Sequence, residues 1–394
     1  MEIDRLQKII ESCHLNFLIG SGASKKYLET LFNIETLLTD LDNENSFERE
    51  SISYKILETS IRYWYFDKCM RGNLKLVKSD FTLTDEKEQE FNDTVKTYED
   101  FIQALNIILL KRKTNLLNKQ VNIFTTNMDV FLDKVLDKLG IEFNDGFSGK
   151  FESVFKTSNY QKSIYKSSAQ YDVNSELPLF NLFKLHGSLT WDKINQDKIL
   201  YDAQLTTLTN LNKFKFDNGQ LISLFENNKY KSFEELKEEA ESKNKLDNYD
   251  KFKTEYEKLI MINPTKEKFE STTLRLEYYE QMRMYSNVLE KENTVLFVTG
   301  FSFADEHIKE ITLRALNSNP TLLICVFCFN EVDKIKIDTL FAKLKFNNLY
   351  TNFIDYSFQK TTTDIFEQIA KKLDTNFYGK IEGEDINTKN ENKK

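Results

Sequence analysis

The stretch Leu15-Asn-Phe-Leu-Ile-Gly-Ser-Gly-Ala-Ser24 contains the pattern on which the predicted fold depends. Residues 15–19 are a short apolar run of strand length that ends at Gly20 and Gly22. A strand that runs into Gly-x-Gly and then into a helical segment, here from Lys25, suits a nucleotide site, because backbone N–H groups at the turn face a pyrophosphate. Lysine at position 25 breaks the G-x-G-x-x-G pattern and disfavours an ordinary dehydrogenase. Taken alone, Gly-Ser-Gly could also be an ordinary turn.

Glycine is scarce in this chain. The 394 residues contain 11 glycines, under half of the roughly 7 per cent that is usual. A chain that uses glycine so rarely is expected to place it where a side chain cannot be accommodated. Four glycines follow short apolar runs and therefore mark candidate site positions: Gly20, Gly22, Gly187 and Gly300.

Apolar runs of strand length alternate with helical patterns along much of the chain. Strands are predicted at 15–19, 121–126, 182–185, 258–262, 294–299 and 321–329, and helices at 4–12, 130–139, 305–316 and 331–345. This alternation predicts an α/β fold with a Rossmann-like parallel sheet. Residues 45–118 and 205–255 lack it and are predicted to be helical insertions into a single domain of residues 1–380. The polar tail 381–394 is expected to be disordered.

Composition excludes several classes of protein. With 54 basic and 62 acidic residues the net charge is −8, which does not suggest a protein that coats nucleic acid by itself. No apolar run approaches the roughly 18 residues that span a bilayer, and no secretory signal is visible, so we expect a soluble cytoplasmic protein without membrane contact. Cys325 and Cys328 form half of a zinc site with no second pair. Because a separation of three residues on a strand points to opposite faces, both are predicted to be core residues, and no metal is expected.

The segment Thr125-Thr-Asn-Met-Asp129 follows the second predicted strand. Ligands of open α/β sheets bind at the carboxyl ends of the strands, where Asn127 and Asp129 would present an amide and a carboxylate to one small molecule. Either residue could instead cap the following helix, because Asn and Asp are preferred caps.

Two further motifs follow the third and fifth predicted strands. In Lys184-Leu-His-Gly-Ser188, His186 is one of three histidines, and imidazole is the usual proton acceptor near neutral pH. A lone histidine can equally be a satisfied core or surface residue. In the segment from Val298 to His307, Gly300 would allow a ligand to approach and Ser302 could bond a ribose hydroxyl. Asp305 is predicted to cap the next helix.

Together and in this order, the four motifs resemble the sirtuin family. They look most like the divergent bacterial branch that is often encoded beside a HerA-type ring ATPase in anti-phage defence. The residues that carry the resemblance are Gly20-Ser-Gly-Ala-Ser24, Thr126-Asn127-x-Asp129, His186-Gly187 and Gly300-Phe-Ser302. The resemblance covers about 15–25, 121–147, 180–192 and 258–330, and it implies a Rossmann-like sheet of the sirtuin type.

The resemblance implies that NAD is bound as a substrate. It implies that Gly20, Ser21, Gly22, Ala23 and Ser24 hold the pyrophosphate and that Gly300 and Ser302 contact the adenosine. It also implies that Asn127 orders a water or ribose hydroxyl, that Asp129 bonds the nicotinamide carboxamide and that His186 is the general base, with Thr126 and Gly187 as further cofactor-binding residues. Breaking the nicotinamide–ribose bond makes an oxocarbenium-like centre, which needs an oriented nucleophile, a base and a held leaving group.

Two departures from protein-deacylating sirtuins bear on the reaction. The zinc ribbon with two CxxC pairs is absent, and Lys25-Lys-Tyr-Leu-Glu-Thr-Leu31 stands in place of a Gly-Ile-Pro-Asp-Phe-Arg-like segment. Water is therefore the expected acceptor, and we expect an NAD⁺ glycohydrolase of anti-phage defence, gated by a partner or by homo-oligomerisation. A HerA-type ring ATPase is the implied partner, with nucleic acid reached only through it. The alternatives are a non-catalytic NAD or ADP-ribose sensor that controls an ATPase or nuclease, and an NAD-dependent protein deacylase.

Overall fold

The computed structural model describes residues 2–31, 34–44, 48–112, 117–170, 172–194, 198–217, 219–226, 229–262, 276–341 and 346–374. Its centre is a seven-stranded sheet with the order β15-β14-β13-β1-β2-β8-β3, and every neighbouring pair in it is parallel. The strands are β1 (His14–Ile19), β2 (Gln120–Thr125), β3 (Phe143–Asn144), β8 (Leu179–Lys184), β13 (Thr294–Thr299), β14 (Leu322–Phe327) and β15 (Leu349–Phe353). The predicted Rossmann-like α/β class is confirmed.

The strand order reverses beside β1. From β1 the chain builds outward through β2 and β8, and it then returns to place β13 on the other side of β1. Ile19 pairs with both Thr125 and Thr299, so β1, β2 and β13 end at the same level. In open α/β sheets the loops at such a reversal diverge and leave a crevice for ligands.

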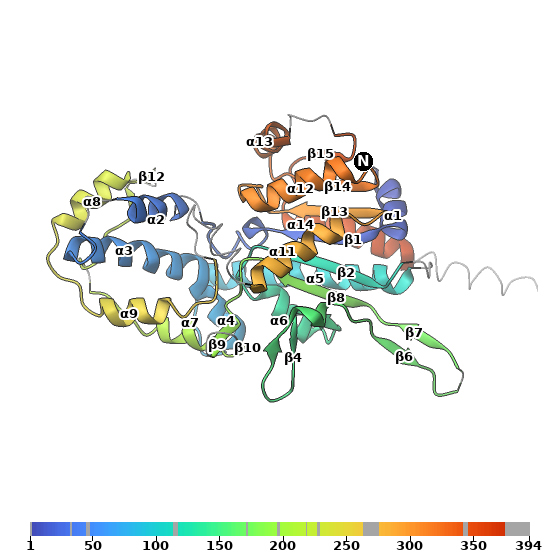
Figure 1. The fold of residues 1–394 in the computed structure, drawn as a ribbon, viewed down its shortest axis with the longest axis horizontal. Helices are drawn as coiled ribbons and strands as arrows, with labels where there is room; N and C mark the ends of the chain where they lie inside the picture. Colours follow the sequence, from blue (N-terminus) through green and yellow to red (C-terminus); the bar gives the residue numbers. More distant parts are fainter. Residues whose placement is uncertain are drawn as a thin grey trace, which may run out of the picture.

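Helices cover both faces of the sheet (Figure 1). One face packs on α1 (Ile3–Ser12), α5 (Asp85–Lys111), α6 (Phe131–Lys138), and the C-terminal helical segment that begins with α14 (Phe358–Thr361). The other face packs on α11 (Leu276–Leu289), α12 (Glu306–Ser318) and α13 (Glu331–Phe341). Alternation along β1 explains the two layers, because Leu15 and Phe17 enter the first core and Leu18 enters the second.

The two predicted insertions meet in one helical lobe, at the left of Figure 1. The lobe consists of α2 (Ile34–Asn43), α3 (Ile52–Tyr65), α7 (Thr206–Leu211), α8 (Phe233–Glu241) and α9 (Tyr249–Tyr256). They share one hydrophobic cluster, in which Ile61 of α3 lies with Leu236 of α8 and Phe252 of α9. Met128 and Leu189, which follow β2 and β8, belong to the same cluster, so the lobe packs against the loops at the carboxyl ends of these strands.

Several boundaries differ from the predicted ones. The range 45–118 has two roles, because α5 packs on the sheet through Tyr98 and Phe101 instead of joining the lobe. The predicted helix from Lys25 is absent: a 3-10 turn, η1 (Ser21–Ala23), leads into further turns and then into the lobe. The predicted strand 258–262 forms only a single bridge, between Met261 and Gly187.

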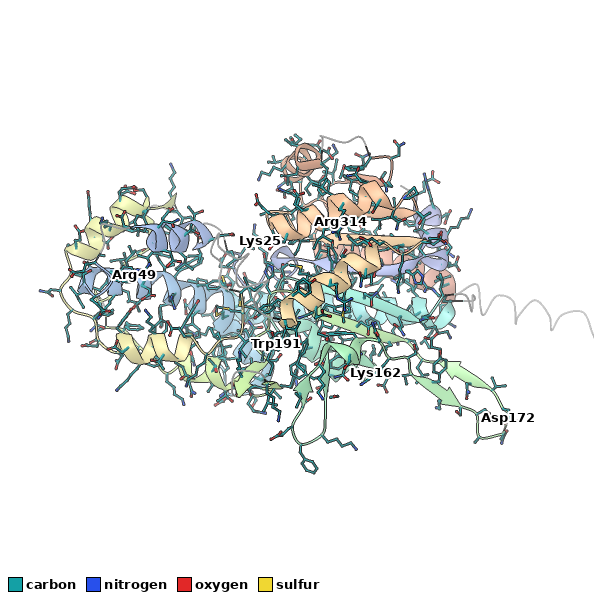
Figure 2. All side chains as sticks on the ribbon, in the orientation of Figure 1. Lys25, Arg49, Lys162, Asp172, Trp191 and Arg314 are labelled. Carbon is teal, nitrogen blue, oxygen red and sulfur yellow. The ribbon has the colours of Figure 1, made fainter. Side chains whose placement is uncertain are left out.

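Smaller strands that the sequence pattern did not reveal extend from the body. A four-stranded antiparallel sheet has the order β4-β5-β10-β9, and the hairpin β6–β7 projects away from the sheet, with Asp172 near its tip (Figure 2). The bounds are β4 (Phe147–Ser148), β5 (Val154–Phe155), β6 (Tyr165–Ser167), β7 (Asn174–Glu176), β9 (Trp191–Ile194) and β10 (Lys198–Tyr201). A two-stranded pair, β11 (Phe225–Glu226) and β12 (Lys229–Tyr230), lies near α8. The tail 381–394 lies outside the described residues.

The two cysteines of the Cys-x-x-Cys pair are buried in different cores. Cys325 belongs to the cluster on one face of the sheet and Cys328 to the cluster on the other, which confirms their prediction as core residues. Within the described ranges, no group of three or more His, Cys, Asp or Glu side chains is arranged to hold a metal ion. In the same part of the chain, no helix combines the length and apolar composition needed to cross a membrane.

Candidate functional site

The loops that follow β1 and β2 are joined by side-chain hydrogen bonds. Asn127 Nδ2 donates to the carbonyl oxygen of Gly20 at 3.1 Å. Ser24 Oγ donates to Asp129 Oδ2 at 2.8 Å and lies 2.9 Å from the Tyr98 hydroxyl. The structure therefore brings the first two predicted motifs together at the carboxyl edge of the sheet.

The loops that follow β1 and β13 touch through their glycines. A Cβ on Gly20 would lie 2.4 Å from the Gly300 carbonyl oxygen, and a Cβ on Gly300 would lie 2.5 Å from the Ala23 nitrogen. Gly300 also has a φ of +63°, which side chains disfavour. These glycines allow the two loops to approach each other closely. The packing of the loops therefore requires Gly20 and Gly300 whether or not a ligand binds.

The amides of the Gly20–Ser24 loop are largely used inside the protein. Gly22 N donates to the Gly300 carbonyl, Ala23 N to the Gly20 carbonyl, and Ser24 N to the Ser21 carbonyl. The sequence predicted that a helix N-terminus would offer these donors to a pyrophosphate. In the structure, the amides of Ala23 and Ser24 instead donate to carbonyl groups of the 3-10 turn itself. Ser21 and Gly22 are exposed, whereas Ala23 and Ser24 are buried.

Asn127 keeps one unsatisfied polar atom. Its side chain is 7 % exposed, and among the described residues its Oδ1 has no hydrogen-bond partner. Thr299 Oγ1, at the end of β13, likewise has no hydrogen-bond partner among the described residues. Thr126, beside Asn127, is half-buried. Leaving a buried acceptor unpaired costs free energy, so an orphaned amide oxygen at a strand end marks a place where a ligand or water is expected to donate.

Asp129 is held from several sides. Besides the bond from Ser24, its Oδ1 accepts a long bond of 3.4 Å from the Phe131 amide near the start of α6. Burial raises the pKa of Asp129, and the nearby Lys184 ammonium opposes that rise. The Lys184 ammonium itself donates to the Asp129 carbonyl oxygen and lies 2.8 Å from Asp133 Oδ2. Lys184 therefore ties the loop after β2 to the end of β8.

His186 lies next to Asp129's loop because β2 and β8 are neighbours. Thr125 pairs with Lys184 in register, so Asn127 and His186 each follow that pair by two residues. Gly187, which follows His186, has a φ of +84°, and a Cβ there would lie 2.2 Å from the Ile260 carbonyl oxygen. Gly187 therefore allows the chain to turn against the segment that leads out of the lobe.

The His186 imidazole has a carboxylate partner that the sequence did not reveal. His186 Nε2 lies 3.0 Å from Asp305 Oδ2, and both side chains are largely buried. The other oxygen of Asp305 accepts from the amides of His307 and Ile308 at 3.1 Å, which confirms Asp305 as the N-cap of α12. A helix N-terminus favours an ionised carboxylate. Nε2–H of a neutral His186 ring donates a hydrogen bond to an ionised Asp305, which leaves Nδ1 as the proton acceptor.

Exposed groups follow β13 and β14, beside these loops. Ser302 is exposed after β13, and the ring of Phe329, which follows β14, is 62 % exposed. The Lys25 ammonium lies 5.9 Å from the centre of this ring. In Figure 2, Lys25 lies where the helical lobe meets the sheet body, as does Trp191.

A carboxyl near the site gives stability a pH dependence. Burial raises the pKa of Asp145 to about 6 from its usual 3.8, and repulsion from Asp133 adds to the rise. A carboxyl with a raised native pKa contributes stability that is complete below pH 3.8 and is lost as the pH rises through about 6. Asp145→Asn keeps the acceptor for the Phe147 amide, so we expect the variant to gain about 1–3 kcal/mol relative to wild type between pH 4.5 and pH 7.5.

Urea unfolding of both proteins at the two pH values measures this gain. Asp137→Asn, at an exposed position of α6, is the matched control and should give the same difference from wild type at both values. A gain for Asp145→Asn that does not depend on pH would contradict the assignment.

The arrangement as a whole offers a proton acceptor with an orienting carboxylate, an unsatisfied amide oxygen, and exposed groups after β13 and β14. This combination can position a polar substrate and remove a proton from a bound hydroxyl or water. No protein-family model and no curated protein matches the chain.

Proposed function

We propose that the chain is an NAD⁺ glycohydrolase with a site of the sirtuin type, which cleaves NAD⁺ to nicotinamide and ADP-ribose with water as the acceptor. The observation that carries the proposal is the grouping at one strand-order reversal of Asn127, with its unpaired Oδ1, and of His186, with its partner Asp305. Dinucleotides bind across such a reversal in Rossmann-like sheets.

We infer one orientation of the substrate from the order of the strands. The adenosine lies on the β13 side, near Gly300, Ser302 and the exposed Phe329 ring, and the nicotinamide lies on the β2 and β8 side. The pyrophosphate crosses the exposed Ser21–Gly22 edge, where Lys25 supplies a positive charge to it. In this orientation, Asn127 Oδ1 accepts a hydrogen bond from a ribose hydroxyl or from the attacking water.

The chemistry follows from these positions. The bond between C1′ of the ribose and the nicotinamide nitrogen breaks, and its electron pair leaves with the neutral nicotinamide. Positive charge develops on C1′ and the ring oxygen, and a water held by Asn127 Oδ1 attacks C1′. His186 Nδ1 takes the proton of that water, and the Asp305 carboxylate stabilises the imidazolium that forms. The products are ADP-ribose, nicotinamide and one proton.

The biological setting belongs to the same proposal. Uncontrolled loss of NAD would harm the host, so activity is gated by a homo-oligomer or by a HerA-type ring ATPase, with nucleic acid engaged only through that partner. The helical lobe contacts the loops of the site, and it is the part of the chain on which such a partner would act.

Purified full-length protein incubated with NAD⁺, alone and with a co-encoded ATPase, is expected to release nicotinamide, as measured by chromatography. Asn127→Ala should lower the rate at least about 100-fold, because it removes the group that orders the nucleophile. Asn122→Ala is the matched control: Asn122 lies on β2, which Asn127 follows, and its Nδ2 donates to Asn16 Oδ1 inside the sheet. Equal rates for Asn127→Ala and wild type would refute the site assignment.

A non-catalytic NAD or ADP-ribose sensor is the second candidate. The internal use of the loop amides favours it, because fewer donors remain to stabilise charge during a reaction. A sensor binds NAD or ADP-ribose in calorimetry but releases no nicotinamide under any condition, and His186→Ala leaves its binding unchanged. A protein deacylase, in contrast, would depend on an acyl-lysine peptide and yield O-acyl-ADP-ribose.

A further inference from the structure

The helix α3 of the lobe continues into an irregular segment that ends beside the site. Its regular turns stop at Tyr65 and are followed by a π-helical turn, η2 (Phe66–Met70), a 3-10 turn, η3 (Arg71–Asn73), and the short helix α4 (Leu74–Val77). Such changes of hydrogen-bond pattern within one helical path often occur at functional positions. The segment Tyr65–Asn73 thus links the lobe to the sheet.

Asn73, at the end of this segment, is completely buried and uses both ends of its amide. Its Oδ1 accepts from the Val130 amide at 3.0 Å, and its Nδ2 donates to the Met70 carbonyl at 2.9 Å. Val130 immediately precedes α6 and follows Asp129, so its amide is one of the donors that a helix start leaves without a partner. The Asn73 side chain therefore connects the irregular segment to the loop that holds Asn127 and Asp129.

The same segment also holds the chain that follows the Gly20–Ser24 loop. The Tyr27 hydroxyl donates to the Gly72 carbonyl at 3.0 Å, and the Glu29 amide donates to the Lys68 carbonyl at 3.2 Å. Gly72 also packs close to this chain, because a Cβ there would lie 2.8 Å from Leu28 Cδ2 and 2.9 Å from Tyr27 Cε1. Two loops of the site thus rest on one segment.

A weaker contact lies one step closer to the lobe. The Tyr65 hydroxyl lies 3.7 Å from Met128 Sδ, between Asn127 and Asp129. Tyr65 is buried in the hydrophobic cluster of the lobe, in which α3 packs against α8. A displacement of α3 is therefore transmitted to the loop after β2 at two points, Met128 and Val130.

We propose that Asn73 is a positioning residue for the loop Thr126–Val130, and that through it the helical lobe sets the position of Asn127. A partner that moves α3 would shift Val130 and so alter the site without touching the substrate. The activity readout of this proposal rests on the proposed NAD⁺ cleavage, but its structural readout does not.

Hydrogen–deuterium exchange on the full-length protein tests the positioning role. In Asn73→Ala, the Val130 amide loses the acceptor that Asn73 Oδ1 provides, and a purely local role would accelerate exchange there alone. The Asn127 amide bonds Thr125 Oγ1 at 3.0 Å and does not contact Asn73. The proposal predicts that exchange at Asn127 is also faster, by about tenfold, because the loop is released as a unit.

The matched control is Asn319→Ala. Asn319 is also buried, donates to the Leu289 and Lys291 carbonyls at 2.8 Å, and lies before β14 at the opposite end of the sheet. It should lower stability comparably and leave exchange at Asn127 unchanged. Asn73→Asp keeps the acceptor for the Val130 amide and should restore slow exchange. This variant also tests the positioning role if the alanine variant fails to fold.

Activity separates this proposal from the proposed function. If wild type releases nicotinamide, Asn73→Ala should lower kcat about tenfold with little change in KM. Unchanged exchange at Asn127 in Asn73→Ala overturns the positioning role, even if NAD⁺ is cleaved. The role is also overturned if Asn73→Asp shows fast exchange at Val130 without an effect at Asn127. If no variant cleaves NAD⁺, faster exchange at Asn127 in Asn73→Ala still supports it.

Discussion

Replacing Asp305 by asparagine is expected to lower the rate of nicotinamide release by about 10²- to 10⁴-fold while the protein stays folded. Asp305 accepts from the His186 ring with one oxygen and caps α12 with the other. Asparagine is as good a cap as aspartate, so α12 is retained. Its Nδ2 would donate to His186 Nε2, which places the ring proton on Nδ1 and removes the proton acceptor.

Two further variants isolate this effect. Asp305→Ser keeps a capping oxygen but places no donor on the imidazole, so its rate should lie between those of wild type and Asp305→Asn. His186→Ala and the double variant with Asp305→Asn should be about equally slow, because residues that act as a unit are not additive. Steady-state kinetics with thermal unfolding of each variant gives both measurements. Near-normal kcat in folded Asp305→Asn would show that His186 does not act through Nδ1.

The strands that carry the site could be predicted because they are buried on both faces. Residues 15–19, 121–126 and 294–299 are short, mostly apolar runs that contain Asn16, Asn122 and several threonines, and a high apolar content is expected of central strands in a parallel sheet. The same reasoning was wrong for 258–262, where Ile260 and Ile262 are buried in the core on the α11–α13 face of the sheet, Met261 is buried in the lobe, and one bridge joins Met261 to Gly187. Periodicity alone does not distinguish a buried strand from another buried segment.

The helical lobe could not be predicted as one unit. Its two parts are far apart in the sequence, and they are joined by long-range packing such as that of α3 against α8 and α9. No local pattern contains such long-range contacts. The absent helix after Ser24 has a related cause, because the chain leaves the sheet there to enter the lobe.

The candidate site was predictable in its positions but not in its interactions. Strand ends and scarce glycines identify Gly20, Asn127, His186 and Gly300, and the structure joins all four loops by hydrogen bonds or close contacts. The capping role of Asp305 follows from its place before a helix, whereas its contact with His186 depends on the pairing of β8 and β13 with their neighbours across the sheet. Asn73 has no local signal at all.

Gly300→Ala is expected to have the largest effect on stability, a loss of about 2–5 kcal/mol of unfolding free energy. Part of the loss comes from a side chain at φ +63°, which costs about 1–2 kcal/mol. The rest comes from the contact with the loop after β1, where the new Cβ would lie 2.5 Å from Ala23 N and 2.9 Å from the Gly22 carbonyl carbon. Backbone atoms cannot rotate away, so the two loops must separate.

Gly140→Ala separates these two causes, because Gly140 has a nearly equal φ of +61° and no atom within 4 Å of the position that its Cβ would take. It should lose only about 1–2 kcal/mol, the cost of the backbone conformation. Denaturant unfolding of both variants gives the difference, which measures the crowding between the loops. Because the candidate site is built on the same loops, folded Gly300→Ala should also release nicotinamide more slowly than folded Gly140→Ala. If the two variants unfold at the same denaturant concentration, the loops are not in contact, and crowding between them is not the reason for a glycine at position 300.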